Sequence, residues 1–269
     1  MKGYAGHRVS GDGTQLTAWL QTGPGPVVVF QHGLCGDAGQ PAEVFPSGHG
    51  FRHAVLDCRG HGSSAAGDLA NLSIAGFAAD VAAMVAALHL RPVAMGGISM
   101  GAAIALRLAV QRPDLVPALI LSRPAWVVGN GPDNMQPNAE VGALIAAGQG
   151  VAAFASSAAA RRLAAGAPDN LASLKGFFNR RPADVTSALL MQISADGPGV
   201  READLAALKM PVLILATADD MIHPLAHAQS LAGMIPGSAL VIVPAKGRNR
   251  AAHVAGMQAA ILSFLKRLT

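Results

Sequence analysis

The sequence predicts an α/β protein with a mostly parallel sheet flanked by helices and a block of helices inserted into it. Short apolar runs such as residues 26–30 are typical of strands buried on both faces. They alternate with segments of helical spacing, of which residues 74–90 are the clearest. The alternation stops over residues 124–208, where only alanine-rich helical stretches occur, and then resumes. We therefore expect one core domain, residues 1–123 and 209–269, with residues 124–208 as an inserted helical cap.

The individual elements follow from the same patterns. A hairpin is expected at the start, because two short segments flank the turn residues 10–13 (Ser-Gly-Asp-Gly). The remaining strands are apolar runs, and the helices are amphipathic or alanine-rich segments. The expected strands cover residues 6–9, 16–20, 26–30, 52–56, 92–96, 118–121, 211–215 and 239–243. The expected helices cover residues 74–90, 102–110, 140–148, 151–165, 171–178, 183–194, 225–234 and 250–268.

The composition excludes several classes of protein. Half of the 269 residues are hydrophobic and 13% are charged, so the chain can bury a sizeable core. A formal charge of +4 without any Lys/Arg run argues against nucleic-acid binding. Cys35 and Cys58 alone make neither a disulfide framework nor a set of metal ligands. Because neither a signal peptide nor a membrane span is evident, we expect a cytoplasmic protein that does not associate with membranes. The oligomeric state is left open.

One turn, residues 97–101 (Gly-Ile-Ser-Met-Gly), organises the chain. An expected strand precedes it and an expected buried helix follows it. A G-x-S-x-G in that context is a nucleophile elbow, which lifts the hydroxyl of Ser99 clear of the backbone at a helix N-terminus. The pentapeptide alone is equally compatible with a glycine-rich turn that carries a chance serine.

Three motifs in order make the sequence resemble the α/β-hydrolase superfamily. His32-Gly33 follows one expected strand, residues 57–64 (Asp-Cys-Arg-Gly-His-Gly-Ser-Ser) follow the next, and the elbow at Ser99 follows a third. The resemblance covers nearly all of the chain outside the cap and points to the serine esterase-like branch. It implies the α/β-hydrolase fold and chemistry without a metal or a cofactor. Haloalkane dehalogenases and epoxide hydrolases look similar but place aspartate where this chain has Ser99.

The resemblance also implies an oxyanion hole. A serine hydroxyl attacks a carbonyl only when a base takes its proton, and the tetrahedral intermediate needs fixed donors for its oxyanion. One donor should be the backbone N–H of Met100, the residue after the nucleophile. By resemblance the second is the N–H of Leu34. The side chains of Leu34 and Met100 are then expected to line the acyl pocket.

Two histidines near these motifs are expected to be structural. In the family, the motif at residues 57–64 is a turn in which Asp57 and Arg59 fix the local backbone, so His61 should take no part in catalysis. His32 is expected to pack or to form a hydrogen bond beside the oxyanion hole. Neither is our choice for the base.

The catalytic acid should follow the strand that ends at Leu215, since the triad order in this fold is Ser, acid, His. The family pattern here resembles G-x-x-D-x-x-x-P, with the acid four residues before a proline. That register, counted from Pro224, selects Asp220 and puts Thr217 in place of the glycine. Asp219 is the alternative, with a solvated loop carboxylate as its ordinary role.

The expected histidine departs from the family pattern. Arg248 stands after Gly247, where a histidine ordinarily follows the glycine, and arginine cannot act as a base at neutral pH. His253 is the only histidine beyond the last expected strand. Its spacing to Met257 puts it near the inward face of the final helix. It is therefore either the base or a histidine packed at the helix start. His223, just after the acid, is a third candidate.

Other residues are placed to bind substrate. Arg123 and Trp126 follow the strand that ends at Leu121 and are expected to face the pocket beneath the cap. Arg248 and Arg250 lie at the expected rim, where they either hold a substrate carboxylate or are solvated.

Together these residues predict a metal-independent serine hydrolase that cleaves an ester, thioester or lactone of a small to medium acyl substrate. Ser99, His253 and Asp220 would form the triad, and catalysis would pass through an acyl-enzyme. Acyl transfer to an alcohol and cleavage of a carbon–carbon bond can run on the same residues. The alternative from a different class is a ligand-binding protein that keeps the fold but lacks a competent base.

Overall fold

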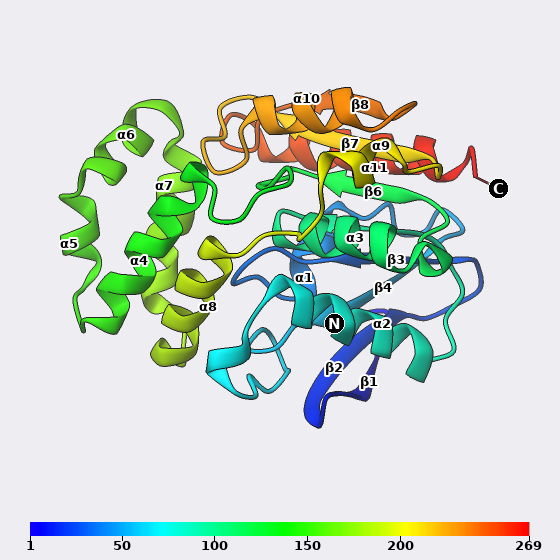
Figure 1. The fold of residues 1–269 in the computed structure, drawn as a ribbon, viewed down its shortest axis with the longest axis horizontal. Helices are drawn as coiled ribbons and strands as arrows, with labels where there is room; N and C mark the ends of the chain where they lie inside the picture. The colour runs from blue at the N-terminus through cyan, green and yellow to red at the C-terminus, as the bar shows by residue number, and fades with distance from the viewer. Residues whose placement is uncertain (269) are drawn as a thin grey trace.

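The structure, a computed structural model, describes residues 1–268 and is built on one eight-stranded sheet with helices on both faces (Figure 1). The strands are β1 (Tyr4–Gly11), β2 (Thr14–Gln21), β3 (Val27–Gln31), β4 (Arg52–Asp57), β5 (Pro92–Ile98), β6 (Leu119–Ser122), β7 (Val212–Thr217) and β8 (Ala239–Val243). Their order in the sheet is β1-β2-β4-β3-β5-β6-β7-β8. The pairs β1·β2 and β2·β4 are antiparallel, and every later pair is parallel. The predicted α/β-hydrolase class, with its mostly parallel sheet, is confirmed.

Two apolar layers hold the helices on the sheet. On one face lie α2 (Ile74–Ala87), α3 (Met100–Gln111) and α10 (Leu225–Met234), and their buried residues join one large cluster. On the other face, α1 (Gly39–Val44) and α11 (Arg250–Leu265) pack against each other over a smaller cluster. The inner strands β3 and β7 are buried along their whole length, as expected of strands covered on both faces. The short helix α9 (Glu202–Ala206) packs against α10.

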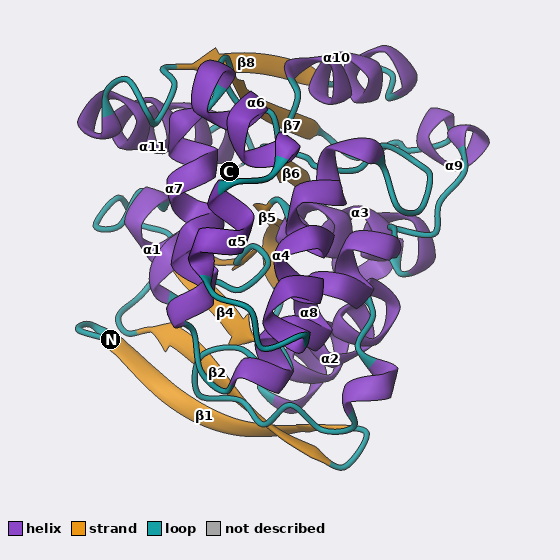
Figure 2. Cartoon of the chain, turned by 90° about the vertical axis from the view of Figure 1, so that its left-hand side faces the viewer, coloured by secondary structure: helices purple, strands orange, loops and turns teal. Residues whose placement is uncertain are grey.

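Five helices form a separate group at one end of the sheet, which we call the helical insert. They are α4 (Gln136–Ala146), α5 (Val151–Ala155), α6 (Ala158–Gly166), α7 (Pro168–Gly176) and α8 (Ala183–Ala195). Figure 1 shows them beside the sheet, and in Figure 2 they stand in front of the strand ends. The single helix expected over residues 151–165 is wrong. Ser157 ends it, because its hydroxyl caps α6 by accepting a hydrogen bond from the amide of Ala160 at 3.1 Å.

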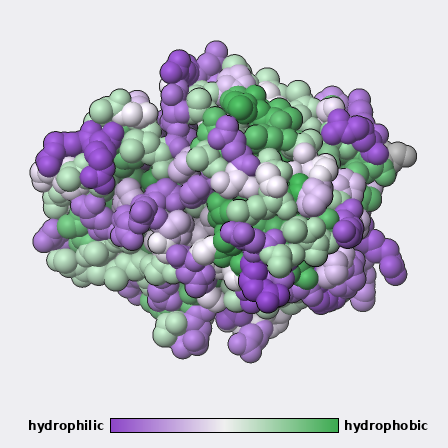
Figure 3. All heavy atoms as spheres, turned by 45° about the horizontal axis from the view of Figure 1, so that its top comes forward, coloured by the Kyte–Doolittle hydropathy of each residue, from purple (hydrophilic) through white to green (hydrophobic). Residues whose placement is uncertain are grey.

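The surface mixes polar and apolar residues over the face seen in Figure 3. The most exposed large apolar side chain among residues 1–268 is Ile242, on the edge strand β8, at 56%. Over the same residues, no helix combines the length and the apolar character that crossing a membrane requires. The 3-10 turns are Leu69–Asn71, Pro113–Leu115, Asp133–Met135 and Phe177–Asn179.

Candidate active site

Ser99 lies at the turn between β5 and α3, where its backbone adopts a φ of 56°. A positive φ is strained for a residue that carries a Cβ, and such strain gathers at functional sites. The turn also requires glycine on both sides. A Cβ added to Gly97 would lie 2.5 Å from the carbonyl carbon of Gly101, and one added to Gly101 would lie 2.5 Å from the carbonyl oxygen of Gln31. The strained strand–turn–helix geometry that the motif predicts is therefore present at Ser99.

Ser99 opens on a cavity of about 110 Å³, which we call the serine cavity. Its floor comes from the core and includes Ser99 and Leu34. Its roof includes Asn170 of α7, in the helical insert, and Phe177 of the 3-10 turn that follows α7. The insert thus covers the carboxyl ends of the strands, which is where open α/β sheets bind ligands.

The two backbone amides expected to hold an oxyanion are unengaged. Within residues 1–268, neither the N–H of Leu34 nor that of Met100 donates a hydrogen bond to another residue. The amides that flank Leu34 are taken, because Gly33 donates to Gln40 Oε1 at 2.6 Å and Cys35 donates to His61 Nε2 at 2.9 Å. The loop is therefore fixed by its neighbours while Leu34 keeps a free donor. The Met100 side chain, by contrast, is fully buried and does not line the serine cavity, so that expectation is wrong.

His32 and His61 are structural, as the sequence predicts. Both rings are fully buried, and each accepts a backbone hydrogen bond at Nε2: His32 from Cys58 at 3.0 Å, His61 from Cys35 at 2.9 Å. Burial lowers the pKa of both rings, which keeps them neutral and able to accept. His61 has no free nitrogen for catalysis, because its Nδ1 donates to the carbonyl of Arg59 at 2.9 Å and its Nε2 is already occupied.

Asp57 and Arg59 fix the turn between these histidines. The Asp57 carboxylate accepts hydrogen bonds from the amide of Ala38 and from Trp19 Nε1, at 2.9 and 3.0 Å. Arg59 forms a two-pronged ion pair with the buried Asp80, at 2.7 and 2.8 Å. The local backbone role expected of both residues is what these contacts provide.

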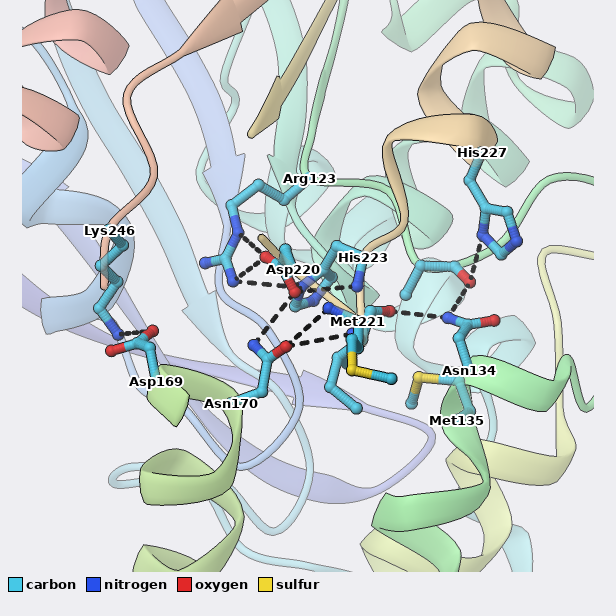
Figure 4. A network of polar contacts seen from close by, with 12 residues as sticks. Arg123, Asn134, Met135, Asp169, Asn170, Asp220, Met221, His223, His227 and Lys246 are labelled. Carbon is cyan, nitrogen blue, oxygen red and sulfur yellow. Dashed lines mark hydrogen bonds and ion pairs between the residues drawn. The ribbon is translucent and has the colours of Figure 1, made fainter. Parts of the chain in front are cut away.

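Asp220, the expected acid, is held by buried polar partners (Figure 4). Its side chain is only 5% exposed. One carboxylate oxygen accepts from Arg123 Nε and Nη2, at 2.9 and 2.6 Å. The other accepts from the amide of His223 at 3.0 Å and from Asn170 Nδ2 at 3.1 Å. Burial alone would raise the pKa of Asp220, but the charges and hydrogen bonds of His223 and Arg123 outweigh it and hold the pKa well below its usual range.

His223 is the histidine that the structure brings to Asp220. Its Nδ1 lies 2.9 and 3.0 Å from the two carboxylate oxygens. Nδ1 also lies 3.1 Å from Arg123 Nη2, but that group donates to Asp220 at the shorter distance of 2.6 Å. Since Asp220 is ionised and only accepts, we assign the proton to Nδ1, which leaves the lone pair on Nε2. His223 lines the serine cavity together with Ser99, and its Nε2 has no hydrogen-bond partner in the described part of the chain. Burial lowers the pKa of His223, against the opposing effect of Asp220, so the ring is neutral near pH 7.

His253, the residue expected to be the base, is engaged elsewhere. Its Nδ1 donates to the carbonyl of Pro244 at 2.9 Å, and the residue is 4% exposed. Within residues 1–268 it forms no hydrogen bond with Ser99 or Asp220. The reason is that α11 begins at Arg250, so His253 falls on the inward face of that helix. It lines a second cavity, of about 380 Å³, on the α1 and α11 side of the serine cavity.

The residues expected at the pocket take different positions. Trp126 does not face the serine cavity: it is 2% exposed, and its indole N–H donates to the carbonyl of Asp196 at 2.8 Å. Arg248 does not face it either, because its 78% exposed side chain pairs with Asp219 at the surface. Both expectations of substrate contact are therefore corrected. Arg123 does line the serine cavity, as expected, while it holds Asp220.

Two residues that the sequence reasoning missed complete the site. Asn170, at the start of α7, donates to Asp220, and its Oδ1 accepts from the amides of Met221 and Ile222 at 2.8 and 3.3 Å. Lys246 lines the serine cavity and pairs with Asp169 of α7 at 3.3 Å. The loop motif carries no sign of Asn170, which lies 50 residues away in the alanine-rich insert.

Comparison with known proteins agrees with this architecture. The family model described as alpha/beta hydrolase fold matches residues 26–249. The chain belongs to the α/β hydrolase fold family. One curated relative is the sn-1-specific diacylglycerol lipase ABHD11 of Mus musculus, 34% identical over 125 residues. That match covers 45% of this chain and 38% of the length of the relative.

Solved structures show the same fold over almost the whole chain. The enol-lactonase from Burkholderia xenovorans LB400 superposes with a TM-score of 0.73 at 22% identity, covering 97% of this chain and all of that one. An esterase from Exiguobacterium antarcticum reaches a TM-score of 0.75 at 19% identity, again covering 97% of this chain and all of that one. At these identities the likeness is one of fold.

Proposed function

We propose that this chain is a serine hydrolase that cleaves an ester, thioester or lactone of a small to medium acyl substrate without a metal. The observation that carries the proposal is the strained Ser99 beside two free backbone amides, on a covered cavity that a neutral histidine also lines. The family and the esterase and lactonase neighbours agree with it.

The reaction would proceed in two halves on these residues. The Ser99 hydroxyl attacks the substrate carbonyl while a histidine takes its proton, and the N–H groups of Leu34 and Met100 donate to the oxyanion. The tetrahedral intermediate then expels the alcohol, which receives that proton and leaves an acyl-serine. A water molecule then attacks the acyl-serine while the histidine takes its proton. The second tetrahedral intermediate expels Ser99, which receives that proton, and the acid is released.

For the base we infer His223 rather than the sequence candidate His253. His223 is supported by its bond to Asp220, its place on the serine cavity, and an Nε2 that is free to accept a proton. His253 has its Nδ1 on Pro244 and lines the other cavity. Asp220 then orients His223 and stabilises its charged form. The base thus comes from the loop after β7 and not from the loop after β8.

The direct test combines active-site labelling with turnover of p-nitrophenyl acetate. We expect a fluorophosphonate probe to label the wild-type protein and not Ser99→Ala. We expect His223→Ala to lose at least about a hundredfold in kcat, the usual size of a general-base effect, and His253→Ala to stay close to wild type. If only His253→Ala loses activity, the base assignment returns to His253. If wild type is neither labelled nor faster than Ser99→Ala, the hydrolase proposal fails.

A second function, ligand binding without catalysis, is favoured by one observation. Arg123 occupies one oxygen of the acid with two hydrogen bonds, and Arg248 stands at the position where the family ordinarily has its histidine. In that case the cavity binds a ligand but Ser99 is not activated. Absence of fluorophosphonate labelling in a folded protein would support ligand binding without catalysis. Acyl transfer and carbon–carbon bond cleavage need the same activated serine and would be separated from hydrolysis by product analysis.

A further inference from the structure

The walls of the serine cavity carry positive charge only. Arg123 and Lys246 line it, and in the described chain no aspartate or glutamate does. The adjoining cavity of about 380 Å³ shares Arg123 and Lys246 as walls, adds Arg250, and has Glu43 as its one acidic residue over residues 1–268. We call this second cavity the cationic chamber. Arg250 and Glu43 pair with each other, with Arg250 Nη2 2.8 Å from Glu43 Oε1, so Arg123 and Lys246 are the cations that both cavities share.

The anions that neutralise two of these cations lie outside both cavities. Asp220 pairs with Arg123, and Asp169 pairs with Lys246, but neither acid lines the serine cavity or the chamber. Arg123 gives its Nε and Nη2 to Asp220, and its Nη1 has no acceptor within residues 1–268. At Arg123 and Lys246 the walls thus present N–H donors, while the compensating oxygens lie behind them. At Arg250 the compensating carboxylate, Glu43, lies in the chamber itself.

His253 adds a polar group to the same chamber. His253 is only 4% exposed, and its Nε2 has no hydrogen-bond partner in residues 1–268. Since Nδ1 carries the proton, Nε2 is an acceptor, open to water or to a donor group in the chamber. Ser122, on the strand next to the elbow, also lines the chamber. With Arg123 and Lys246 on its wall, the chamber therefore suits a polar, negatively charged group.

We propose that the cationic chamber binds a carboxylate at the far end of the substrate, so that the preferred substrates are esters of short dicarboxylic acids. This rests on the proposed hydrolase function, because the ester carbonyl must sit at Ser99 while the carboxylate reaches the chamber. Guanidinium and ammonium groups bind carboxylates through charge-assisted hydrogen bonds. The two cavities share Arg123, Lys246, Gln40 and Ile98 among their lining residues, so they adjoin. The proposal requires that one short acyl chain passes between these residues.

The test compares two esters of equal chain length, p-nitrophenyl hydrogen glutarate and p-nitrophenyl valerate. We expect kcat/KM to favour the glutarate ester by about tenfold or more, the size of one or two charged hydrogen bonds. Arg250→Gln should reduce that preference by about tenfold, mainly through a higher KM for the glutarate ester. Lys246→Gln should reduce it in the same way.

Arg248→Gln is the matched control. Arg248 lies two residues before Arg250, in the loop that precedes α11, but its side chain pairs with Asp219 and lines neither cavity. It should leave the preference unchanged. Equal kcat/KM for the two esters in wild type, or a preference that Arg248→Gln lowers as much as Arg250→Gln does, would overturn the proposal.

A binding measurement separates this proposal from the hydrolase itself. If neither ester is cleaved, the hydrolase function fails, and calorimetric titration of the wild-type protein with glutarate still tests the chamber. Binding that Arg250→Gln weakens and Arg248→Gln does not would support the chamber. Absence of glutarate binding in that case would overturn both.

Discussion

The candidate site has two halves that are held in different ways. The serine half, Ser99 with the amides of Leu34 and Met100, is fixed by backbone geometry and by glycines that leave no room for a Cβ. The acid half, Asp220 and His223 with their partners, is fixed by side-chain charges and hydrogen bonds. We therefore expect substitutions that add steric bulk to displace the serine half, whereas a change of pH or the loss of a single polar group should impair the acid half.

The acid half is also the half that depends on the helical insert. Asn170 of the insert donates to Asp220, and Asn134 donates to the carbonyl of Ile222 at 2.7 Å (Figure 4). In Figure 4 the loop that carries Asp220 and His223 lies between these two asparagines. Within residues 1–268 the serine half forms no hydrogen bond with the insert, and the backbone N–H of Ser99 donates instead to the carbonyl of Ser122 in the core, at 2.9 Å. Movement of the insert would therefore disturb the acid before it disturbs the nucleophile.

The largest effect is expected from Gly101→Ala, which attacks the serine half. The new methyl group would lie 2.5 Å from the carbonyl oxygen of Gln31, so the elbow must shift. We expect kcat/KM to fall by at least about a hundredfold, as an ångström-scale displacement of a nucleophile does. The free energy of unfolding should fall by about 1–3 kcal/mol, the usual cost of overpacking.

The control for this substitution is Gly129→Ala. Nothing lies within 4 Å of a Cβ at Gly129, and its φ is not positive. Urea unfolding and p-nitrophenyl acetate turnover should both stay near wild type. Wild-type activity in Gly101→Ala would mean that the elbow does not position Ser99 as argued.

These contrasts mark how far the sequence could predict the molecule. The strand pattern and the motif at Ser99 gave the fold and the elbow, because buried strands and glycine-flanked turns depend on neighbours in the sequence. The register from Pro224 selected Asp220, whose buried position agrees with that choice. The partners of Asp220 were not predictable, because Arg123 and Asn170 reach it from 97 and 50 residues away.

The predicted positions of the Arg248 and Trp126 side chains were wrong for a related physical reason. Arg248 was expected at the rim from its position in the loop, but Asp219 draws it to the surface. Trp126 follows β6 as expected, yet the carbonyl of Asp196 accepts its indole N–H inside the core. Sequence position locates the backbone of a loop residue, while a distant partner decides where its side chain points.

The next effect is the pH dependence of the acid half. Burial lowers the pKa of His223 below 6.5, with Arg123 and His227 acting in the same direction and Asp220 against them. A base must be neutral to accept a proton, so activity is present above this pKa and is lost as the pH falls through it. We expect kcat/KM to fall about tenfold for each pH unit below a midpoint that lies under pH 6.5. His253→Ala should leave the midpoint unchanged, and a shifted midpoint in that variant would point to His253 as the base.

A smaller effect is expected from Asn170→Ala, which removes the insert's bond to the acid. We expect kcat to fall about tenfold with little change in KM, because the loss is that of one charged hydrogen bond that positions the acid. Asp169→Ala is the neighbouring control, since Asp169 pairs with Lys246 and does not contact Asp220. Steady-state kinetics on p-nitrophenyl acetate measures both. An equal loss of kcat in the two variants would show that the insert as a whole, and not Asn170, is responsible.

The smallest effect is expected from Arg248→Ala, at the outer edge of the acid half. The ion pair with Asp219 joins side chains that are 78% and 38% exposed, and such surface pairs contribute about 0–1 kcal/mol at low salt. The free energy of unfolding, measured with urea, should therefore fall by no more than about 1 kcal/mol, and this difference from wild type should shrink as NaCl is added. Turnover of the neutral ester should stay within about twofold of wild type, since Arg248 contacts neither Ser99 nor Asp220 within residues 1–268. A large loss of kcat would instead mean that the residue at the usual histidine position takes part in the reaction, and the surface orientation of Arg248 would then not be the one that the working enzyme uses.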